Sequence, residues 1–252
     1  MGEDLAVNER IGFDRIIERD WLDFIASRYA ASRDAKAAFY DTRELVGLTV
    51  GGGASHHNAT GKTMTVLARV WLKVPVAHAP LRDRALGELL DLGPDDRLAF
   101  HWAMCGLAYP FFLDGAGIAG RMLEVGDTVS LSPLRARLSE RWGVRGTMPQ
   151  ASQRLLRTWE RWDVLAETEE PGRYAANDAR PASARAAALV AEARVRAAPG
   201  GALDLDSLQR AADLFPFALP DLRDVLRGSR GVQVVRQGGS GWVVRALAES
   251  GS

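Results

Sequence analysis

The chain of 252 residues carries 32 basic and 32 acidic residues, so its overall charge favours neither a polyanionic nor a polycationic partner. Its single cysteine, Cys105, excludes an internal disulfide, and no apolar run reaches the roughly 20 residues that a membrane-spanning helix needs. With 47% apolar and 25% charged residues, the composition is typical of a soluble globular protein. We therefore expect a cytoplasmic protein with no membrane partner, and the acidic N-terminus does not resemble a signal peptide.

The first half of the chain is predicted to be mostly helical. Its apolar residues recur at spacings of three and four, which is the period of an amphipathic helix. The predicted helices cover residues 13–30, 33–45, 59–74, 80–93 and 95–126. We expect Pro75 to end the third helix and Pro110 to kink or divide the last one.

A glycine-rich stretch, VGGGASHHNATGKTMT (50–65), raises the question of a phosphate-binding loop. Such a loop leaves four residues between its first glycine and the Gly-Lys-Thr triplet, so that backbone amides wrap the phosphates. That position holds His56, which does not easily adopt the backbone geometry that glycine allows. We interpret the stretch as a glycine linker that leads into a helix with a polar first turn. A nucleotide hydrolase that uses Lys62 is the less favoured alternative.

His101 and Cys105 lie four residues apart, a spacing that places two metal ligands on one face of a helix. The surrounding segment is apolar, and no further ligands occur at a recognisable spacing, so we interpret both as core residues. His56 and His57 are adjacent and would point in different directions. No catalytic motif stands out, and we expect neither an enzyme activity nor a bound metal or cofactor.

A different pattern begins at Thr128, where short alternating segments separate the helices. The predicted elements are a strand at 128–132, helices at 133–142 and 148–162, and a hairpin at 163–176. Ser132 is the expected N-cap of the first of these helices, and Gly143 is expected to end it. Thr147 and Gln150 have the spacing of a capping box for the second helix.

The same order recurs near the C-terminus. A helix is predicted at 183–198, a strand at 203–205, helices at 206–215 and 220–228, and a valine-rich hairpin at 231–247. Residues 177–183 have the composition of a linker. We therefore predict a mainly α fold with small β-hairpins, in which a helical N-terminal region (1–97) precedes two winged-helix (helix-turn-helix) units at 98–177 and 183–248.

Charge is distributed unevenly along the chain although it sums to zero. Residues 1–25 hold seven acids and three arginines, a balance of −4. Residues 128–161 hold seven arginines against two glutamates, a balance of +5, and residues 222–247 hold five arginines against one aspartate, a balance of +4. This asymmetry predicts two basic surfaces.

The helix at 148–162 separates its apolar and basic residues. At about 100° per residue, it carries an apolar stripe of Ala151, Leu155, Trp159 and Trp162 and a polar stripe of Gln150, Arg154, Arg157 and Arg161. The tryptophans can then be buried while a row of arginines faces outward toward DNA phosphates and base edges. The predicted DNA-contacting residues of the two units are Arg135, Arg137, Arg145, Gln150, Gln153, Arg154, Arg157, Arg161, Arg173, Arg223, Arg227, Arg230 and Arg236.

Over residues 98–248 the chain resembles tandem winged-helix proteins, and more loosely the BrxA family, accessory proteins of BREX phage-defence systems. The resemblance lies in the order of four segments: ATGKTMTVLARVWL, AMCGLAYPFFLDGAGIAGRML, SPLRARLSERWG and ASQRLLRTWERWDVL. That family is small, largely helical and binds DNA, which the resemblance implies here. It implies no catalytic residues.

These observations predict a non-enzymatic protein that binds double-stranded DNA, acting as a phage-defence accessory factor or a transcriptional regulator. The alternative is a protein-interaction adaptor within a larger bacterial complex, because winged helices also serve as protein-binding modules. The second unit is open to either role, since its basic helix is short and carries two aspartates, Asp221 and Asp224.

Overall fold

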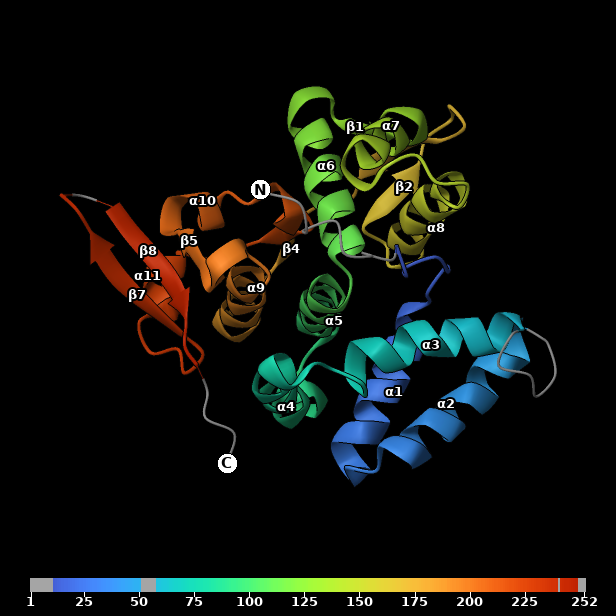
Figure 1. Cartoon of the computed structure of the whole chain (residues 1–252), viewed down its shortest axis with the longest axis horizontal. Coiled ribbons are helices and arrows are strands. Elements are labelled where there is room, and N and C mark those ends of the chain that lie inside the picture. Colours follow the sequence, from blue (N-terminus) through green and yellow to red (C-terminus); the bar gives the residue numbers. More distant parts are fainter. Residues whose placement is uncertain (1–10, 51–57, 240, 249–252) are drawn as a thin grey trace, which may run out of the picture.

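The computed structural model of the chain describes residues 11–50, 58–239 and 241–248. It is mainly helical, with small sheets in its C-terminal half (Figure 1). Within the described ranges, none of the helices combines the length and apolar character that crossing a membrane requires.

The N-terminal part of the chain forms helices α1 to α5, of which α1 and α3 pack against α5. Their bounds are α1 Arg19–Ser32, α2 Ala35–Val50, α3 Ala59–Trp71, α4 Ala79–Glu88 and α5 Pro94–Ala108, with short 3-10 turns at Val76–His78 and Leu89–Asp91. Asn58 caps α3, since its side chain accepts a hydrogen bond from the amide of Gly61 at 2.7 Å. Lys62 is exposed in the first turn of this helix. The glycine-rich residues 51–57 lie outside the described part of the chain.

The first predicted helix begins later than its apolar pattern indicates. Residues 11–18 have no helical structure, and α1 starts at Arg19. Phe13 and Ile17 are fully buried, but the backbone around them bonds to a distant helix: the amide of Ile17 donates to the Thr158 hydroxyl at 3.1 Å. Apolar spacing alone does not distinguish such a buried extended segment from one turn of a helix.

One order of elements, helix–strand–helix–helix–strand–strand, occurs twice in the C-terminal half. The first copy consists of α6 Pro110–Gly126, β1 Thr128–Ser130, α7 Leu131–Trp142, α8 Met148–Arg161, β2 Leu165–Glu167 and β3 Arg173–Ala176. The second consists of α9 Ala184–Arg196, β5 Ala202–Asp204, α10 Leu205–Gln209, α11 Leu222–Leu226, β7 Val232–Gln237 and β8 Gly241–Ala246. We call them the first and second repeat.

Strand pairing is the same in both repeats. The first sheet has the order β1-β3-β2 and the second has the order β5-β8-β7, and each pairing within them is antiparallel. In each, the last strand lies in the middle and pairs with both others, with Val129 opposite Tyr174 in the first sheet and Val234 opposite Val244 in the second. The two copies therefore share a topology although their residues differ.

Proline and glycine set the element boundaries largely as expected, but two predicted caps are wrong. Pro110 divides the predicted long helix into α5 and α6, and Gly143, with φ of 76°, ends α7. The N-cap of α7 is Ser130 rather than Ser132, because the preceding strand is shorter than predicted. Thr147 precedes α8 but makes no side-chain capping bond.

The predicted linker is in fact paired. Within residues 177–183, β4 (Arg180–Pro181) pairs in parallel with β6 (Phe217–Ala218), which lies in the connection between α10 and α11. A 3-10 turn in that connection, Ala212–Leu214, packs against α6. The second repeat is thus held to the rest of the chain through this connection as well as through α9, which packs on α5.

An aromatic cluster around Trp102 of α5 forms the centre of the main core. The Trp102 ring stacks on Trp159 of α8 at 5.6 Å between centroids and meets Phe112 of α6 edge-on at 4.9 Å. Phe215 and Phe217 approach it edge-on at 5.6 and 5.9 Å. Its indole N–H donates to the carbonyl of Asp213 at 3.0 Å, so its polar atom is satisfied.

The contact of α6 with the Ala212–Leu214 turn depends on Gly120. A Cβ at this position would lie 1.9 Å from the carbonyl oxygen of Ala212, a backbone atom that cannot move without shifting the turn. A Cβ at Gly126, at the end of the same helix, would meet nothing within 4 Å.

We therefore expect Gly120→Ala to lower the free energy of unfolding by about 2–3 kcal/mol, because the added methyl overpacks the contact. Gly126→Ala should leave it unchanged or raise it by up to about 1 kcal/mol. Urea denaturation followed by tryptophan fluorescence measures both. Equal effects of the two substitutions would show that α6 does not lie against this turn.

Candidate nucleic-acid interface

Helix α8 presents one buried and one open face. Trp159 is fully buried, and Trp162, just beyond the helix, is 1% exposed, as the apolar stripe predicts. Gln150 and Gln153 are exposed in the N-terminal half of the helix. The open face therefore begins with uncharged polar side chains that have both donors and acceptors.

Arg154 does not face solvent freely. It is half-buried, and its Nη1 donates to the carbonyl of Asp14 at 2.6 Å. The segment 11–18 runs along this side of α8, where Ile17 bonds Thr158 and accepts from the Trp162 indole at 2.8 Å. The prediction of a row of outward arginines is wrong at this position, because the N-terminal segment covers it.

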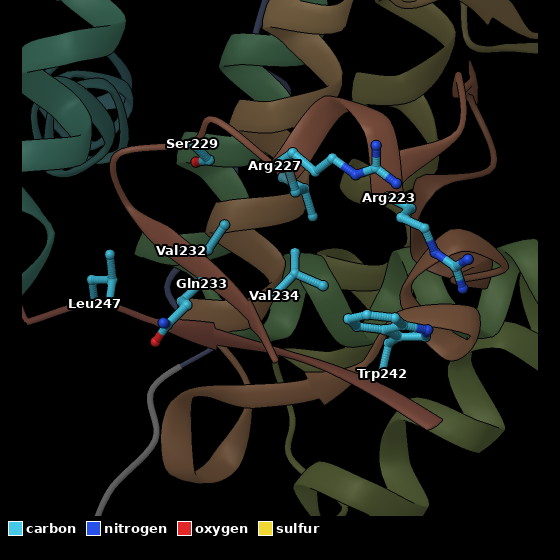
Figure 2. Close-up of a pocket in the computed structure, with 9 residues that line it drawn as sticks. Arg223, Arg227, Ser229, Val232, Gln233, Val234, Trp242 and Leu247 are labelled. Atoms are coloured by element: carbon cyan, nitrogen blue, oxygen red, sulfur yellow. The ribbon is translucent and has the colours of Figure 1, made fainter. Parts of the chain in front are cut away.

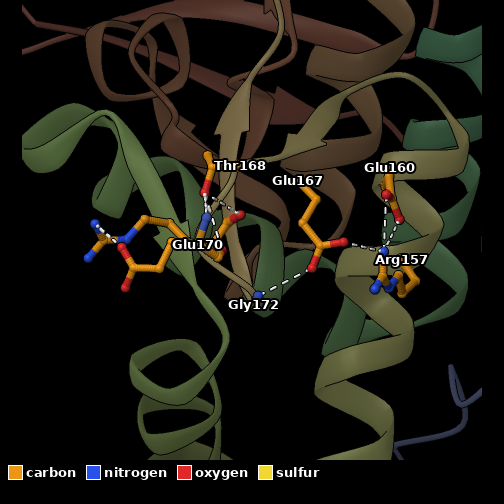
Figure 3. Close-up of polar contacts among 7 residues, drawn as sticks. Arg157, Glu160, Glu167, Thr168, Glu170 and Gly172 are labelled. Carbon is orange, nitrogen blue, oxygen red and sulfur yellow. Dashed lines mark hydrogen bonds and ion pairs between the residues drawn. The ribbon is translucent and has the colours of Figure 1, made fainter.

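Arg157 is also held within the molecule (Figure 3). Its Nη1 lies 2.9 Å from Glu160 Oε2 and 2.8 Å from Glu167 Oε2. Glu167 is the last residue of β2, and its other oxygen accepts from the amide of Gly172 at 3.2 Å in the hairpin turn. The hydrogen bond to Glu160, with smaller contributions that include Glu167, raises the pKa of Arg157. The predicted free guanidinium is thus part of a clamp between α8 and the hairpin.

Arg161 and Arg173 are more exposed than Arg154 and Arg157. The Arg161 side chain is 61% exposed, and its Nε lies 3.7 Å from Glu18. Arg173 is 44% exposed at the start of β3 and pairs with Glu170 at 2.8 Å. Both pairs are at the surface, where an ion pair contributes little, so a competing phosphate can replace the carboxylate.

The structure separates Arg135 from Arg137 on α7. Arg135 lines a shallow depression of about 340 Å³ together with the hairpin turn around Pro171 and Gly172. Arg137 lines a different depression, next to Asp114 of α6. Among the described residues neither arginine forms an ion pair. Arg145 lies in the α7–α8 loop, where its Nε donates to the Trp142 carbonyl at 3.0 Å.

The arginines of the second repeat have different partners. Arg223 of α11 lies over the Trp242 ring at 5.1 Å from its centroid, and Arg236 donates to the carbonyl of Gly239 at 2.6 Å. Arg227 is 71% exposed and 3.7 Å from Asp224, and Arg230 is exposed. Positive charge is therefore less neutralised here than along α8.

His101 and Cys105 are core residues, as their apolar surroundings predict. His101 is fully buried, with Nδ1 accepting from the Trp71 indole at 3.2 Å and Nε2 lying 3.0 Å from Asp23. Burial lowers the pKa of His101 and raises the pKa of the Cys105 thiol. In the part of the chain that the structure describes, no three His, Cys, Asp or Glu side chains are grouped to hold a metal ion.

Comparison with known proteins returned no match to a family model, to a curated protein or to a solved structure. The resemblance to tandem winged-helix proteins and to the BrxA family therefore stays a prediction.

The different environments of Arg154 and Arg161 have a measurable consequence. We expect Arg154→Ala to lower the free energy of unfolding by about 1–2 kcal/mol, because it leaves the carbonyl of Asp14 without its charged donor. Arg161→Ala, on the same helix, should change it by less than about 0.5 kcal/mol, since that side chain is largely exposed. Thermal or urea unfolding compares them. If Arg154→Ala proves as neutral as Arg161→Ala, the segment 11–18 does not depend on this bond.

Proposed function

We propose that the chain binds double-stranded DNA through its first repeat, and that both repeats are winged-helix units. The order and antiparallel pairing of the elements support the second statement, because a winged helix consists of three helices and a three-stranded sheet that ends in a hairpin. In this arrangement α6, α7 and α8 are the three helices, and the β2–β3 turn is the wing. Helix α8 is then the one that enters the major groove.

The observation that carries the proposal is the open, polar N-terminal half of α8. Its 14 residues give a helix about 21 Å long, enough to reach into a major groove. Gln150 and Gln153 are exposed where a recognition helix usually reads bases, and glutamine can pair with an adenine edge through two hydrogen bonds. Arg135, Arg161 and Arg173 are exposed around this face and would contact phosphates.

The ion pairs of Arg157, which form the clamp, weaken the proposed DNA face. Glu160 and Glu167 place carboxylates next to the proposed DNA face, where they repel phosphates and occupy the arginine. DNA binding then requires Arg157 to exchange a carboxylate for a phosphate. Breaking the pairs with Glu160 and Glu167 costs free energy, so it lowers the affinity of the protein for DNA. The affinity then also depends on the hairpin, because Glu167 belongs to it. In line with the family resemblance, we place this binding in phage defence or transcriptional control.

The DNA face is tested by adding one negative charge to it. Gln153→Glu should weaken binding to a duplex about tenfold, because a carboxylate then lies against the phosphates, while the exposed side chain has no internal bond to lose. Gln237→Glu is the matched control, since Gln237 is exposed at the tip end of β7 in the second repeat. Fluorescence anisotropy with a labelled duplex measures both. Equal affinities of the two variants would refute the assignment of α8.

The clamp itself is tested by neutralising Glu167. We expect Glu167→Gln to raise DNA affinity about threefold or more, because Arg157 loses one of its carboxylate partners and a repulsive charge is removed. Glu169→Gln removes the same charge from the same hairpin turn, at an exposed side chain that does not bond Arg157. A gain that is no larger for Glu167→Gln than for Glu169→Gln would mean that Arg157 does not take part in binding.

A further inference from the structure

The second repeat has a groove on one side of its β-hairpin (Figure 2). It lies between α11 and the β7–β8 hairpin and has a volume of about 370 Å³. Its apolar lining consists of Leu226, Val232, Val234, Trp242 and Leu247. Arg223, Arg227, Ser229 and Gln233 provide its polar lining.

The groove exists because α11 is short. The helix has 5 residues, whereas α8, at the equivalent place in the first repeat, has 14. Where α11 ends, the helix-facing side of the sheet is left partly uncovered, and Val234 and Trp242 remain partly exposed. A concave apolar surface of this kind is stabilised when another apolar group covers it.

The backbone of β7 is also open along one side. In the order β5-β8-β7, β7 is the edge strand, and it lies at the outer edge of the molecule in Figure 1. The amide of Leu247 donates to the carbonyl of Gly231, so the residues that bond to β8 are 231, 233, 235 and 237 by alternation. The amides of Val232, Val234 and Arg236 therefore face away from the sheet. An extended peptide can bond to these groups and add a strand.

Charge decides what kind of peptide fits. Arg223 of α11 and Arg227, just after its end, line the groove. Among the described residues, Arg227 pairs with Asp224 at 3.7 Å, with both side chains about 70% exposed. Such a weak surface pair leaves most of the positive charge available to a carboxylate. The lining thus suits a segment with both aliphatic and acidic side chains.

The same features disfavour a DNA phosphate as the occupant. Asp221 caps α11 by accepting from the amide of Arg223 at 2.8 Å, so a carboxylate already occupies the N-terminal end of the helix. A helix of 5 residues is too short to present several side chains along a major groove. Phosphate binding also makes no use of the apolar lining.

We propose that this groove binds an extended acidic segment of a partner protein, which adds to β7 as a strand and places aliphatic side chains over Val234 and Trp242. This inference does not depend on DNA binding by α8. It assigns the second repeat to protein recognition.

Selection of random peptides displayed on phage, with the whole 252-residue chain as target, tests the proposal. Enriched sequences should combine aliphatic and acidic residues, and synthetic labelled copies of them should bind in a fluorescence anisotropy assay. Arg227→Glu should weaken that binding at least tenfold, because it reverses a charge in the groove without removing a buried group. Arg245→Glu, on the opposite face of the same hairpin, should change it less than twofold.

Hydrogen exchange distinguishes strand addition from other modes. Peptide binding should slow exchange of the amides of Val232, Val234 and Arg236 relative to those of Gln233 and Val235, which already bond to β8. The proposal is overturned if the selection does not converge, if the two charge reversals act alike, or if those three amides are unaffected. It is also overturned if Arg227→Glu abolishes duplex binding but leaves peptide binding intact, since the groove would then be a nucleic-acid site.

Discussion

The packing of Trp102 is the constraint on which the rest of the structure depends. Its ring contacts Trp159 and Trp162 of the α8 region and also Phe215 and Phe217 of the α10–α11 connection. One fully enclosed side chain therefore determines which face of α8 is hidden and how the second repeat is attached. Aromatic contacts of this size dominate the energetics of a core, so α8 has little freedom to rotate and expose a different face.

Once that rotation is set, the outer face of α8 is divided between solvent and the protein itself. Arg154 bonds to the N-terminal segment, and Arg157 pairs with two glutamates. The basic stripe predicted from the sequence is therefore only partly a basic surface. Each arginine that binds internally stabilises the fold and reduces the charge that a polyanion meets. The exposed glutamines carry no charge, so no carboxylate of the protein pairs with them.

The two repeats share a topology but differ in what they leave open. In the first, a long helix covers its sheet and offers a polar outer face. In the second, a helix of 5 residues leaves apolar sheet surface, arginines and an unpaired strand edge together. The length of one helix thus changes the chemistry of the exposed surface while the order of elements stays the same. The two proposals assign these surfaces to different partners, the first to a nucleic acid and the second to a protein segment.

Short-range features of the sequence determined most of the helices and strands. The breaks at Pro110 and Gly143, the valine-rich hairpin and the burial of Trp159 all follow from backbone geometry and helical periodicity, which act over a few residues. Only the tertiary structure decided that residues 11–18 are extended rather than helical, because their backbone bonds to α8, more than a hundred positions away. It likewise decided which arginines stay exposed: Glu160 is visible as a neighbour three residues from Arg157, but Glu167 reaches it only through the folded hairpin. Charge pairing depends on distances in space, and these are set by the core rather than by spacing along the chain.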